Sequence, residues 1–354
     1  MAGGYDRSGE ARVAVTEPHY SFVIPILNEE DTLHELIRRL QAVMDSLAEP
    51  SEVVLVDDGS TDRSFDVMLE LHRSDPRVKA LRLTRNFGHQ MAITAGLDHA
   101  VGRAVIIMDG DLQDPPEVAL ELIRRWREGY DVVYAVRDTR AGESWLKRKT
   151  AKAFYRLMTR VGDIDIPQET GDFRLVDRQA VDAVTAMREH RRYLRGMFAW
   201  VGYRQTGITY ERDARYAGTT KFSFGRMLAF AIDGIVSFSE APLRIALAGG
   251  FLVSALSFLL GVGAVVLKVA GLYTVPGWAS LAVGVAFFSG VQLSLTGVMG
   301  IYVARIHEEV KRRPLYLVRD SLGVAYTQAH GDGVTRQQQL DLFRDPSTAT
   351  ASPR

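Results

Sequence analysis

Two carboxylates separated by one glycine are the residues of this chain best suited to chemistry. Asp109 and Asp111 directly follow an apolar run at 104–108 that predicts a buried strand, and the Leu-Gln-Asp-Pro-Pro run at 112–116 leads into a helical pattern. Because ligands of open α/β sheets bind beyond the carboxyl ends of the strands, both acids are expected at a binding edge. Two neighbouring carboxylates repel each other, and hard oxygen ligands suit Mg²⁺ or Mn²⁺. The alternative, a solvated Asp-rich turn, fits an isolated Asp-x-Asp better than one placed between a strand and two prolines.

The composition excludes several other functions. The chain has 354 residues with 43 basic and 43 acidic side chains, so its net charge does not indicate a nucleic-acid partner. It has no cysteine, which excludes disulfides, thiolate metal sites and a cysteine nucleophile. Residues 1–17 lack the apolar core of a signal peptide and are predicted to be a disordered tail.

Two long apolar stretches occupy the C-terminal part of the chain. Residues 245–267 and 279–304 each exceed the roughly 20 residues needed to cross a bilayer core of about 30 Å. Between 245 and 304 the only charged side chain is Lys268. Aromatic residues of the kind that gather at membrane interfaces lie near the expected ends: Tyr273, Trp278 and Tyr302. Two membrane spans are therefore expected, and two buried helices of a soluble core are the alternative.

Basic residues flank this pair of stretches on both sides. The flanking residues are Lys221, Arg226 and Arg244 before the first stretch and Arg305, Lys311, Arg312 and Arg313 after the second. Since the connecting loop holds a single lysine, the positive-inside rule predicts a protein of the cytoplasmic (inner) membrane with both termini in the cytoplasm. Small residues within the stretches would allow close helix packing and are compatible with a homo-oligomer.

Apolar strands alternate with helical patterns in the first half of the chain. Strands are predicted at 20–24, 53–56, 78–83, 104–108 and 131–137, and helices at 30–47, 64–73, 89–100 and 116–127. This alternation predicts the α/β class, with a mostly parallel sheet covered by helices on both faces.

Five units follow from these patterns. They are a tail (1–17), a cytoplasmic catalytic domain (18–221), an interfacial amphipathic helix region (222–243), a two-helix transmembrane hairpin (244–305) and a basic segment with a disordered tail (306–354). A third core helix is the alternative for the apolar part of the 222–243 region.

Several short motifs in a fixed order carry a resemblance to a known family. They are VIPILNEE (23–30), VDDGSTD (56–62), RNFG (85–88), AGLD (95–98) and DGDLQDPPE (109–117). In order and spacing they resemble family 2 glycosyltransferases, which have the Rossmann-like GT-A fold. TGDFRL (170–175), RYAGTTK (215–221) and the two apolar stretches are similar to the polyprenyl-phosphate glycosyltransferases within that family, the group of the bactoprenol glucosyltransferases and dolichol-phosphate mannose synthase. The resemblance covers about residues 20–320.

The resemblance implies a site for a nucleotide-sugar donor. Its expected donor contacts are Pro25, Asn28, Glu29, Asp58, Arg85, Asp109, Arg215 and Lys221, and its expected metal ligands are Asp109, Asp111 and Gln113. An acidic side chain such as that of Asp58 can accept hydrogen bonds from a uracil N–H or ribose hydroxyls. An Asx turn or helix cap is the alternative for residues 57–62 and is the preferred interpretation of Asp62. Arg85 is equally compatible with a plain surface cation.

The resemblance also implies an acceptor phosphate site. The residues at the corresponding positions are Arg137, Ser144, Arg148 and Lys149. The planar fork of arginine matches phosphate oxygens, and the loop from Arg215 to Lys221 resembles one that closes over phosphates. The alternative is a solvated basic helix face over 145–160, which would also suit anionic lipid headgroups.

Asp111 and Asp172 are the expected catalytic residues. Family analogy makes Asp172 a candidate base, because an attacking hydroxyl must lose a proton. A phosphate monoester with a second pKa of about 6 is already largely dianionic near neutral pH and needs no such base. A positioning role for Asp172 is therefore favoured, and a buried structural pair with Arg174 is the alternative.

The expected function is the inverting transfer of one hexose to a lipid phosphate. The donor is a nucleotide sugar, with a UDP-sugar such as UDP-glucose preferred by similarity to the bactoprenol glucosyltransferases. The acceptor is a polyprenyl (undecaprenyl) phosphate at the cytoplasmic face, and the product would serve cell-envelope glycan synthesis or protein glycosylation. One alternative is a polysaccharide synthase, although the chain has no Q-x-x-R-W signature and only two expected spans. Another is a non-catalytic membrane scaffold, which the intact Asp109, Asp111, Arg215 and Lys221 argue against.

Overall fold

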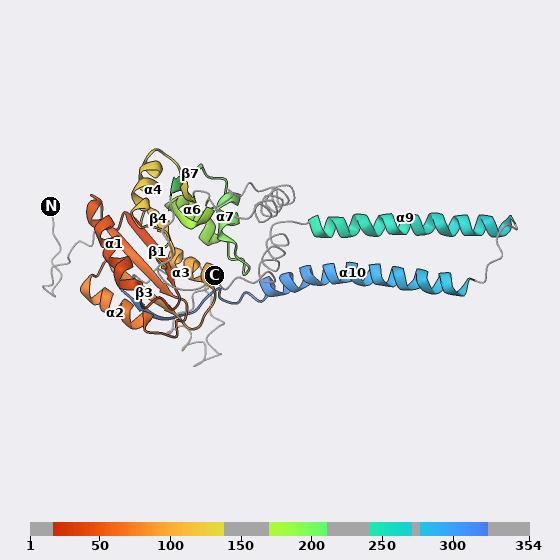
Figure 1. Ribbon diagram of the computed structural model, residues 1–354, viewed down its shortest axis with the longest axis horizontal. Helices are drawn as coiled ribbons and strands as arrows, with labels where there is room; N and C mark the ends of the chain where they lie inside the picture. Colours follow the sequence, from red (N-terminus) through yellow and green to blue (C-terminus); the bar gives the residue numbers. More distant parts are fainter. Residues whose placement is uncertain (1–16, 138–169, 211–240, 271–276, 325–354) are drawn as a thin grey trace, which may run out of the picture.

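An eight-stranded sheet forms the centre of the domain in the computed structural model, which describes residues 17–137, 170–210, 241–270 and 277–324 (Figure 1). The strands lie in the order β7-β5-β6-β4-β1-β2-β3-β8. Their bounds are β1 (Tyr20–Ile26), β2 (Ser51–Asp57), β3 (Val78–Leu83), β4 (Ala104–Ile107), β5 (Val132–Arg137), β6 (Thr170–Asp177), β7 (Gln205–Tyr210) and β8 (Val318–Leu322). Strand β6 is antiparallel to β4 and β5, and β8 is antiparallel to β3, whereas the other pairs are parallel. The predicted mostly parallel α/β sheet is confirmed.

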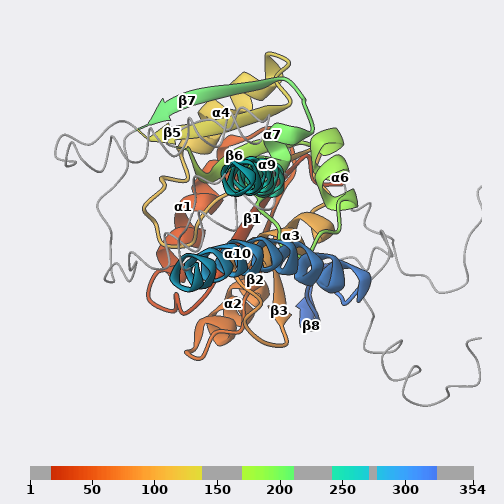
Figure 2. The same cartoon turned by 90° about the vertical axis from the view of Figure 1, so that its right-hand side faces the viewer.

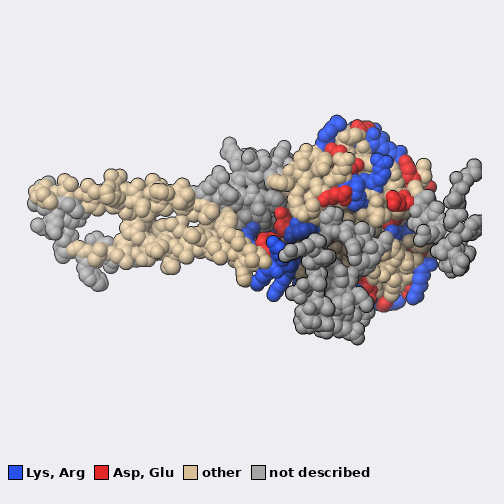
Figure 3. Space-filling model, turned by 180° about the vertical axis from the view of Figure 1, so that it is seen from behind, with Lys and Arg blue, Asp and Glu red and all other residues tan. Residues whose placement is uncertain are grey.

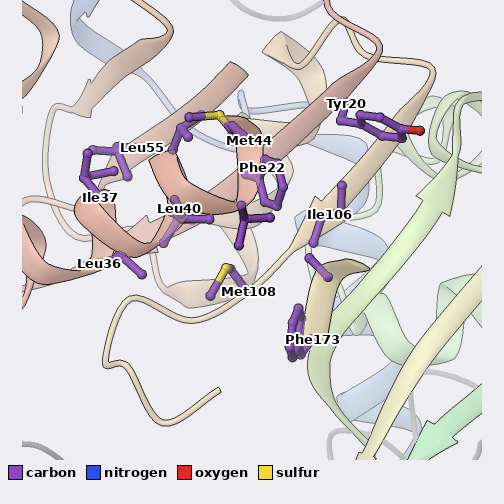
Figure 4. Close-up of a cluster of buried hydrophobic side chains, with 14 of the residues drawn as sticks. Tyr20, Phe22, Leu36, Ile37, Leu40, Met44, Leu55, Ile106, Met108 and Phe173 are labelled. Atoms are coloured by element: carbon purple, nitrogen blue, oxygen red, sulfur yellow. The ribbon is translucent and has the colours of Figure 1, made fainter. Parts of the chain in front are cut away.

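Helices cover both faces of this sheet. Their bounds are α1 (Leu33–Ser46), α2 (Ser64–Ser74), α3 (His89–His99), α4 (Val118–Arg127), α6 (Arg178–Ala186) and α7 (Leu194–Trp200). Helices α1, α2 and α4 share one core cluster with the sheet, and α3, α6 and α7 share the other. Phe22 and Ile24 of β1 belong to the first core (Figure 4), and Val23 between them belongs to the second. Because both faces of the central strands are covered, these strands are continuously apolar.

Close helix–sheet packing explains one of the sequence motifs. Gly96 lies in α3, and a Cβ added there would stand 2.2 Å from Cγ1 of Val23 in β1. Only glycine therefore allows α3 to approach β1 this closely. The packing matters for function because the first turn of α3 reaches the carboxyl end of β4.

Two long apolar helices extend side by side from one side of the domain (Figures 1 and 2). They are α9 (Ala241–Val269) and α10 (Trp278–Val310), and both are long and apolar enough to cross a membrane. The alternative of a soluble core is wrong, because large apolar side chains are exposed, such as Phe251 at 70% and Phe258 at 72%. Both predicted apolar stretches lie within these helices, which supports a membrane protein.

The chain returns to the domain after α10. Leu315 and Tyr316 are buried in the second core, and β8 then pairs with the edge strand β3. The sequence analysis predicted no strand in this segment and also missed β6, β7, α6 and α7. Several predicted segments lie outside the described part of the chain: the alternative basic helix face at 145–160, residues 222–240 of the interfacial region, residues 1–16 of the N-terminal tail and the residues after 324.

Candidate active site

The turn after β4 carries the two predicted metal ligands, Asp109 and Asp111. Gly110 between them lies against the end of β1, where an added Cβ would stand 2.7 Å from Cδ1 of Ile26. A larger residue at the centre of the motif would therefore have to displace the end of the Ile26 side chain. Leu112 then adopts a left-handed conformation, with φ at 57°, and directs the chain towards α4. The turn therefore places both carboxylates beyond the carboxyl end of β4, as the sequence analysis predicted.

Asp109 lies in an environment that disfavours its negative charge. Burial raises the pKa of this carboxyl to about 6, the nearby carboxylate of Asp172 adds to the effect, and His89 opposes it. The Oδ1 atom of Asp109 is buried and accepts no hydrogen bond from any described residue. Its nearest cationic group is the imidazole of His89, whose Nε2 lies 3.5 Å away. A buried carboxylate oxygen that is not hydrogen-bonded is costly unless a cation balances it.

Asp172, at the start of β6, meets residues from two helices. Its Oδ2 lies 3.2 Å from Nε2 of His89 and accepts a 3.4 Å hydrogen bond from Nε2 of Gln90. Its Oδ1 accepts a 2.8 Å hydrogen bond from Nε of Arg195. Burial alone would raise the pKa of Asp172, but the hydrogen bond with His89 and the charge of Arg195 hold it well below its usual range. A carboxylate with such a low pKa is a poor proton acceptor near neutral pH.

Arg174 does not form the side-chain pair with Asp172 that was considered as an alternative. Its guanidinium donates to backbone carbonyls instead, over 2.9 Å to Gly171 and 3.4 Å to Asp172. The Asp172 carboxylate instead pairs with the guanidinium of Arg195 and the imidazole of His89.

His89, Gln90 and Arg195 contact Asp172 but were not predicted as site residues from the sequence. His89 and Gln90 directly follow the RNFG motif, so their position in the sequence was a usable signal. Burial lowers the pKa of His89, but its contacts with Asp172 and Asp109 outweigh burial and raise it. Arg195 lies within a segment with no motif, and only the tertiary structure brings it to the site.

The VDDGSTD motif at the end of β2 forms a turn held by its own carboxylates. Asp57 accepts a 2.8 Å hydrogen bond from the backbone N–H of Ser60, three residues further on. Asp62 accepts a 3.0 Å bond from the backbone N–H of Ser64, two residues further on, which is the Asx-turn alternative; the cap interpretation of Asp62 is wrong, because Arg63 is the N-cap of α2. Asp58 accepts backbone hydrogen bonds from Phe87 at 2.7 Å and Gly88 at 2.9 Å, and burial raises its pKa.

The loop after β1 is hydrogen-bonded to the same turn. The backbone N–H of Asn28 donates to Oγ of Ser60 over 3.0 Å, and that of Glu29 donates to Oγ of Ser64 over 2.8 Å. Pro25 lies in β1 beside Val56 of β2. The three loops after β1, β2 and β3 thus lie together, next to the turn after β4. Arg85 lies in the third loop, exposed and stacked on Phe87 with its guanidinium carbon 4.0 Å from the ring centre.

The residues of this edge fit a divalent cation shared with a phosphate ligand. In the described ranges, no group of three His, Cys, Asp or Glu side chains could hold a metal ion by itself. Asp109, Asp111 and Gln113 supply two carboxylates and one amide, and Mg²⁺-type ions commonly combine one or two carboxylates with substrate phosphates. The buried Oδ1 of Asp109 is the atom whose charge such a cation would balance.

The remaining predicted site residues lie outside the described part of the chain. They are Ser144, Arg148, Lys149, Arg215 and Lys221. Arg137 is the last residue of β5, and only its backbone is described.

Comparisons with known proteins give one family match and several relatives that align with most of the chain. The model of "Glycosyl transferase family 2" matches residues 21–185. The uncharacterized glycosyltransferase YkcC of Bacillus subtilis (strain 168) is 47% identical over 313 residues, covering 88% of this chain and 97% of the relative. The bactoprenol glucosyl transferase of Shigella phage SfII is 39% identical over 301 residues, covering 85% and 97%.

Solved structures are more distant. A glucosyl-3-phosphoglycerate synthase from Mycobacterium tuberculosis, in complex with phosphoglyceric acid, is 18% identical with a TM-score of 0.43, covering 63% of this chain and 80% of that one. A likeness at this level carries no argument about ligands.

Proposed function

The chain belongs to glycosyltransferase family 2, and because it is therefore a glycosyltransferase, we propose that it transfers one sugar from a nucleotide sugar to a polyprenyl phosphate. One observation supports the proposal most strongly. The chain combines a carboxylate site suited to a donor diphosphate with two exposed apolar helices, and after the second helix it returns to the catalytic sheet as β8. Relatives that span most of the chain are named bactoprenol glucosyl transferases, which supports a lipid acceptor.

The reaction is a single displacement at the anomeric carbon. An oxygen of the lipid phosphate forms a bond to that carbon, the bond from the carbon to the donor diphosphate breaks, and its electron pair leaves with the nucleoside diphosphate. Attack from the opposite side inverts the anomeric centre. The phosphate nucleophile is largely dianionic near neutral pH, with a second pKa of about 6, so no protein base is needed. The low pKa of Asp172 accordingly supports a role in positioning the donor sugar or an acceptor-site arginine.

Asp109, Asp111 and Gln113 would hold Mg²⁺ or Mn²⁺ together with the donor phosphates. A bound ion supplies Lewis-acid stabilisation of the departing diphosphate. Pro25 near the end of β1, together with Asn28, Glu29 and Asp58 of the adjoining loops, would bind the nucleoside part of a UDP-sugar such as UDP-glucose. Arg85, Arg215 and Lys221 are proposed as further donor contacts.

The acceptor phosphate would be bound by Arg137, Ser144, Arg148 and Lys149. We place the reaction at the cytoplasmic face of the membrane, with both termini on that side. Lys and Arg side chains gather where α10 meets the domain (Figure 3), and the residues concerned include Lys311, Arg312 and Arg313. Such a cluster is typical of a cytoplasmic helix end.

A donor screen tests the proposal directly. Membranes containing the full chain would receive radiolabelled UDP- and GDP-sugars with added undecaprenyl phosphate, and the expected product is a lipid that carries one sugar. A sugar polymer would instead support the polysaccharide synthase. No transfer and no hydrolysis from any donor would support the non-catalytic scaffold.

A single substitution tests the acceptor site. Charge-assisted hydrogen bonds are worth about 1.5–3 kcal/mol each, so Arg148→Ala should lower kcat/KM for polyprenyl phosphate by roughly ten- to a hundredfold. Thermal protection by the nucleotide should be unchanged. The matched control is Arg73→Ala, an exposed position on α2, which should leave both quantities unchanged. Equal loss of donor protection in Arg148→Ala would place this arginine on the diphosphate, and no loss would return it to a solvated basic face.

A further inference from the structure

The loop between α6 and α7 contacts the end of the membrane helix α10. Nε of Arg191 donates to Oε2 of Glu308 over 2.9 Å. The backbone N–H of His190 donates to Oε1 of Glu309 over 2.9 Å, and its ring Nδ1 lies 3.2 Å from Oε2 of the same carboxylate. The other ring nitrogen, Nε2, lies 2.8 Å from the carbonyl oxygen of Arg313. We call these contacts the α10 latch.

The residues that directly follow the latch reach the active site. The backbone N–H of Leu194 donates to Oε1 of Gln90 over 3.0 Å, and Nε2 of the same glutamine donates to Asp172. Arg195 forms the 2.8 Å ion pair with the Asp172 carboxylate. A run of six residues, 190–195, therefore contacts α10 at one end and the site carboxylate at the other.

The middle of this run is held rigidly. Arg192 is only 6% exposed, and its guanidinium donates to the backbone carbonyls of Met187 and Val184, the latter over 3.0 Å. A buried guanidinium that lost these acceptors would carry a large desolvation cost. Leu194 and Phe198 beyond it are buried in the second core. The run between the latch and Arg195 is therefore packed against the domain and contains no long exposed linker.

The segment after α10 also contacts α3, the helix whose residues His89 and Gln90 meet Asp172. The hydroxyl of Tyr316 donates to Oδ2 of Asp98 over 2.7 Å, and Nη1 of Arg188 donates to the same oxygen over 2.9 Å. Asp98 lies near the end of α3, whose first turn carries His89 and Gln90. Both groups of residues around Asp172 are thus connected to the segment that leaves α10.

We propose that Glu308 and Glu309 are positioning residues for the transfer reaction, because the end of α10 fixes the loop that sets Arg195 against Asp172. The inference rests on the proposed function in that it assumes a role for Asp172 in turnover. It goes beyond that function by making the membrane helix a part of the active-site framework rather than an anchor alone.

Enzyme kinetics on the full chain in lipid nanodiscs test this inference. The double variant Glu308→Ala/Glu309→Ala should lower kcat by roughly two- to twenty-fivefold, since each of the two exposed ion pairs is worth a factor of about 1.5 to 5. KM for the donor should change less than kcat, because Glu308 and Glu309 are not among the residues proposed to bind the donor. Glu70→Ala, an exposed glutamate on α2, is the matched control and should retain full activity.

Charge exchange separates positioning from a general loss of structure. Arg191→Glu and Glu308→Arg should each lower kcat, and the two together should restore it. In an Arg195→Lys background, removal of the latch should lower kcat no further, because both changes act on the same contact. Additive losses, or a reciprocal exchange that does not restore kcat, would overturn the inference.

Amide hydrogen exchange gives a readout that needs no acceptor. Removal of both glutamates should speed exchange in residues 194–200 as well as in the loop itself, and Glu70→Ala should not. Faster exchange confined to 187–193 would overturn the inference even if the enzyme transfers sugar as proposed. If the wild-type chain transfers no sugar to polyprenyl phosphate, the proposed function fails while the exchange result still decides whether α10 orders α7.

Discussion

Asp109→Asn should make the metal-free protein more stable while it removes activity. Burial raises the pKa of Asp109 from 3.8 to about 6, so the folded protein favours the protonated carboxyl. By linkage, the stability lost when Asp109 ionises is zero below the pKa that it has in the unfolded chain. The loss grows as pH rises and is complete above the pKa of Asp109 in the folded protein. This rise in the pKa of Asp109 corresponds to roughly 3 kcal/mol of lost stability at pH 7.5. Asparagine has the same shape without the charge, so we expect it to recover about 1–3 kcal/mol.

Thermal unfolding in EDTA measures this effect. For a domain of this size, 1 kcal/mol corresponds to about 2–4 °C, so the variant should unfold several degrees above wild type at pH 7.5. The difference should fall to about half at pH 5, where the wild-type carboxyl is largely protonated. Mn²⁺ with UDP should stabilise the wild type and not the variant. Asp66→Asn, at an exposed position on α2, is the control. An unchanged or lower unfolding temperature at pH 7.5, or a difference that does not depend on pH, would refute the reasoning.

Two further predictions concern the described residues around the site. Asp58→Ala should lower stability by about 2–4 kcal/mol, because the backbone N–H groups of Phe87 and Gly88 lose their acceptor. It should also raise KM for the donor. Thermal unfolding measures the first effect and initial rates measure the second. Tyr316→Phe should cost about 1–2 kcal/mol through the lost hydrogen bond to Asp98, whereas Tyr203→Phe should be neutral; equal unfolding temperatures for the two variants would contradict the assigned bond.

The sequence was most informative where one strand or turn determines the structure by itself. Strand β3 has its predicted bounds, Val78–Leu83, and β1, β2 and β4 differ from theirs by a few residues because buried parallel strands are continuously apolar. Asp109 and Asp111 follow the carboxyl end of β4, as the apolar pattern predicted, and their role as ligands of a metal stays a prediction. These features depend on local pattern.

Features that depend on distant pairing could not be predicted in this way. Strand β6 lies between β4 and β5, although β5 precedes it in the chain. Strand β8 has the sequence VRDSL, and because it pairs at the sheet edge mainly through its backbone, it carries no clear apolar pattern. His89 and Arg195 are ordinary polar residues in the sequence. His89 follows the RNFG motif, which was a usable signal, whereas the role of Arg195 appears only when α7 brings it to Asp172.

The position of β8 in the chain gives this enzyme an order of assembly. During synthesis both apolar helices leave the ribosome before β8 exists, so the edge of β3 stays unpaired until the hairpin has been made. The catalytic sheet is therefore completed last, after the membrane segments have had the opportunity to insert. Chains that are cut before α9 to obtain a soluble enzyme would keep this open edge, which is a template for aggregation. Co-expression of the shortened domain with a peptide that contains residues 314–324 is a direct way to close it.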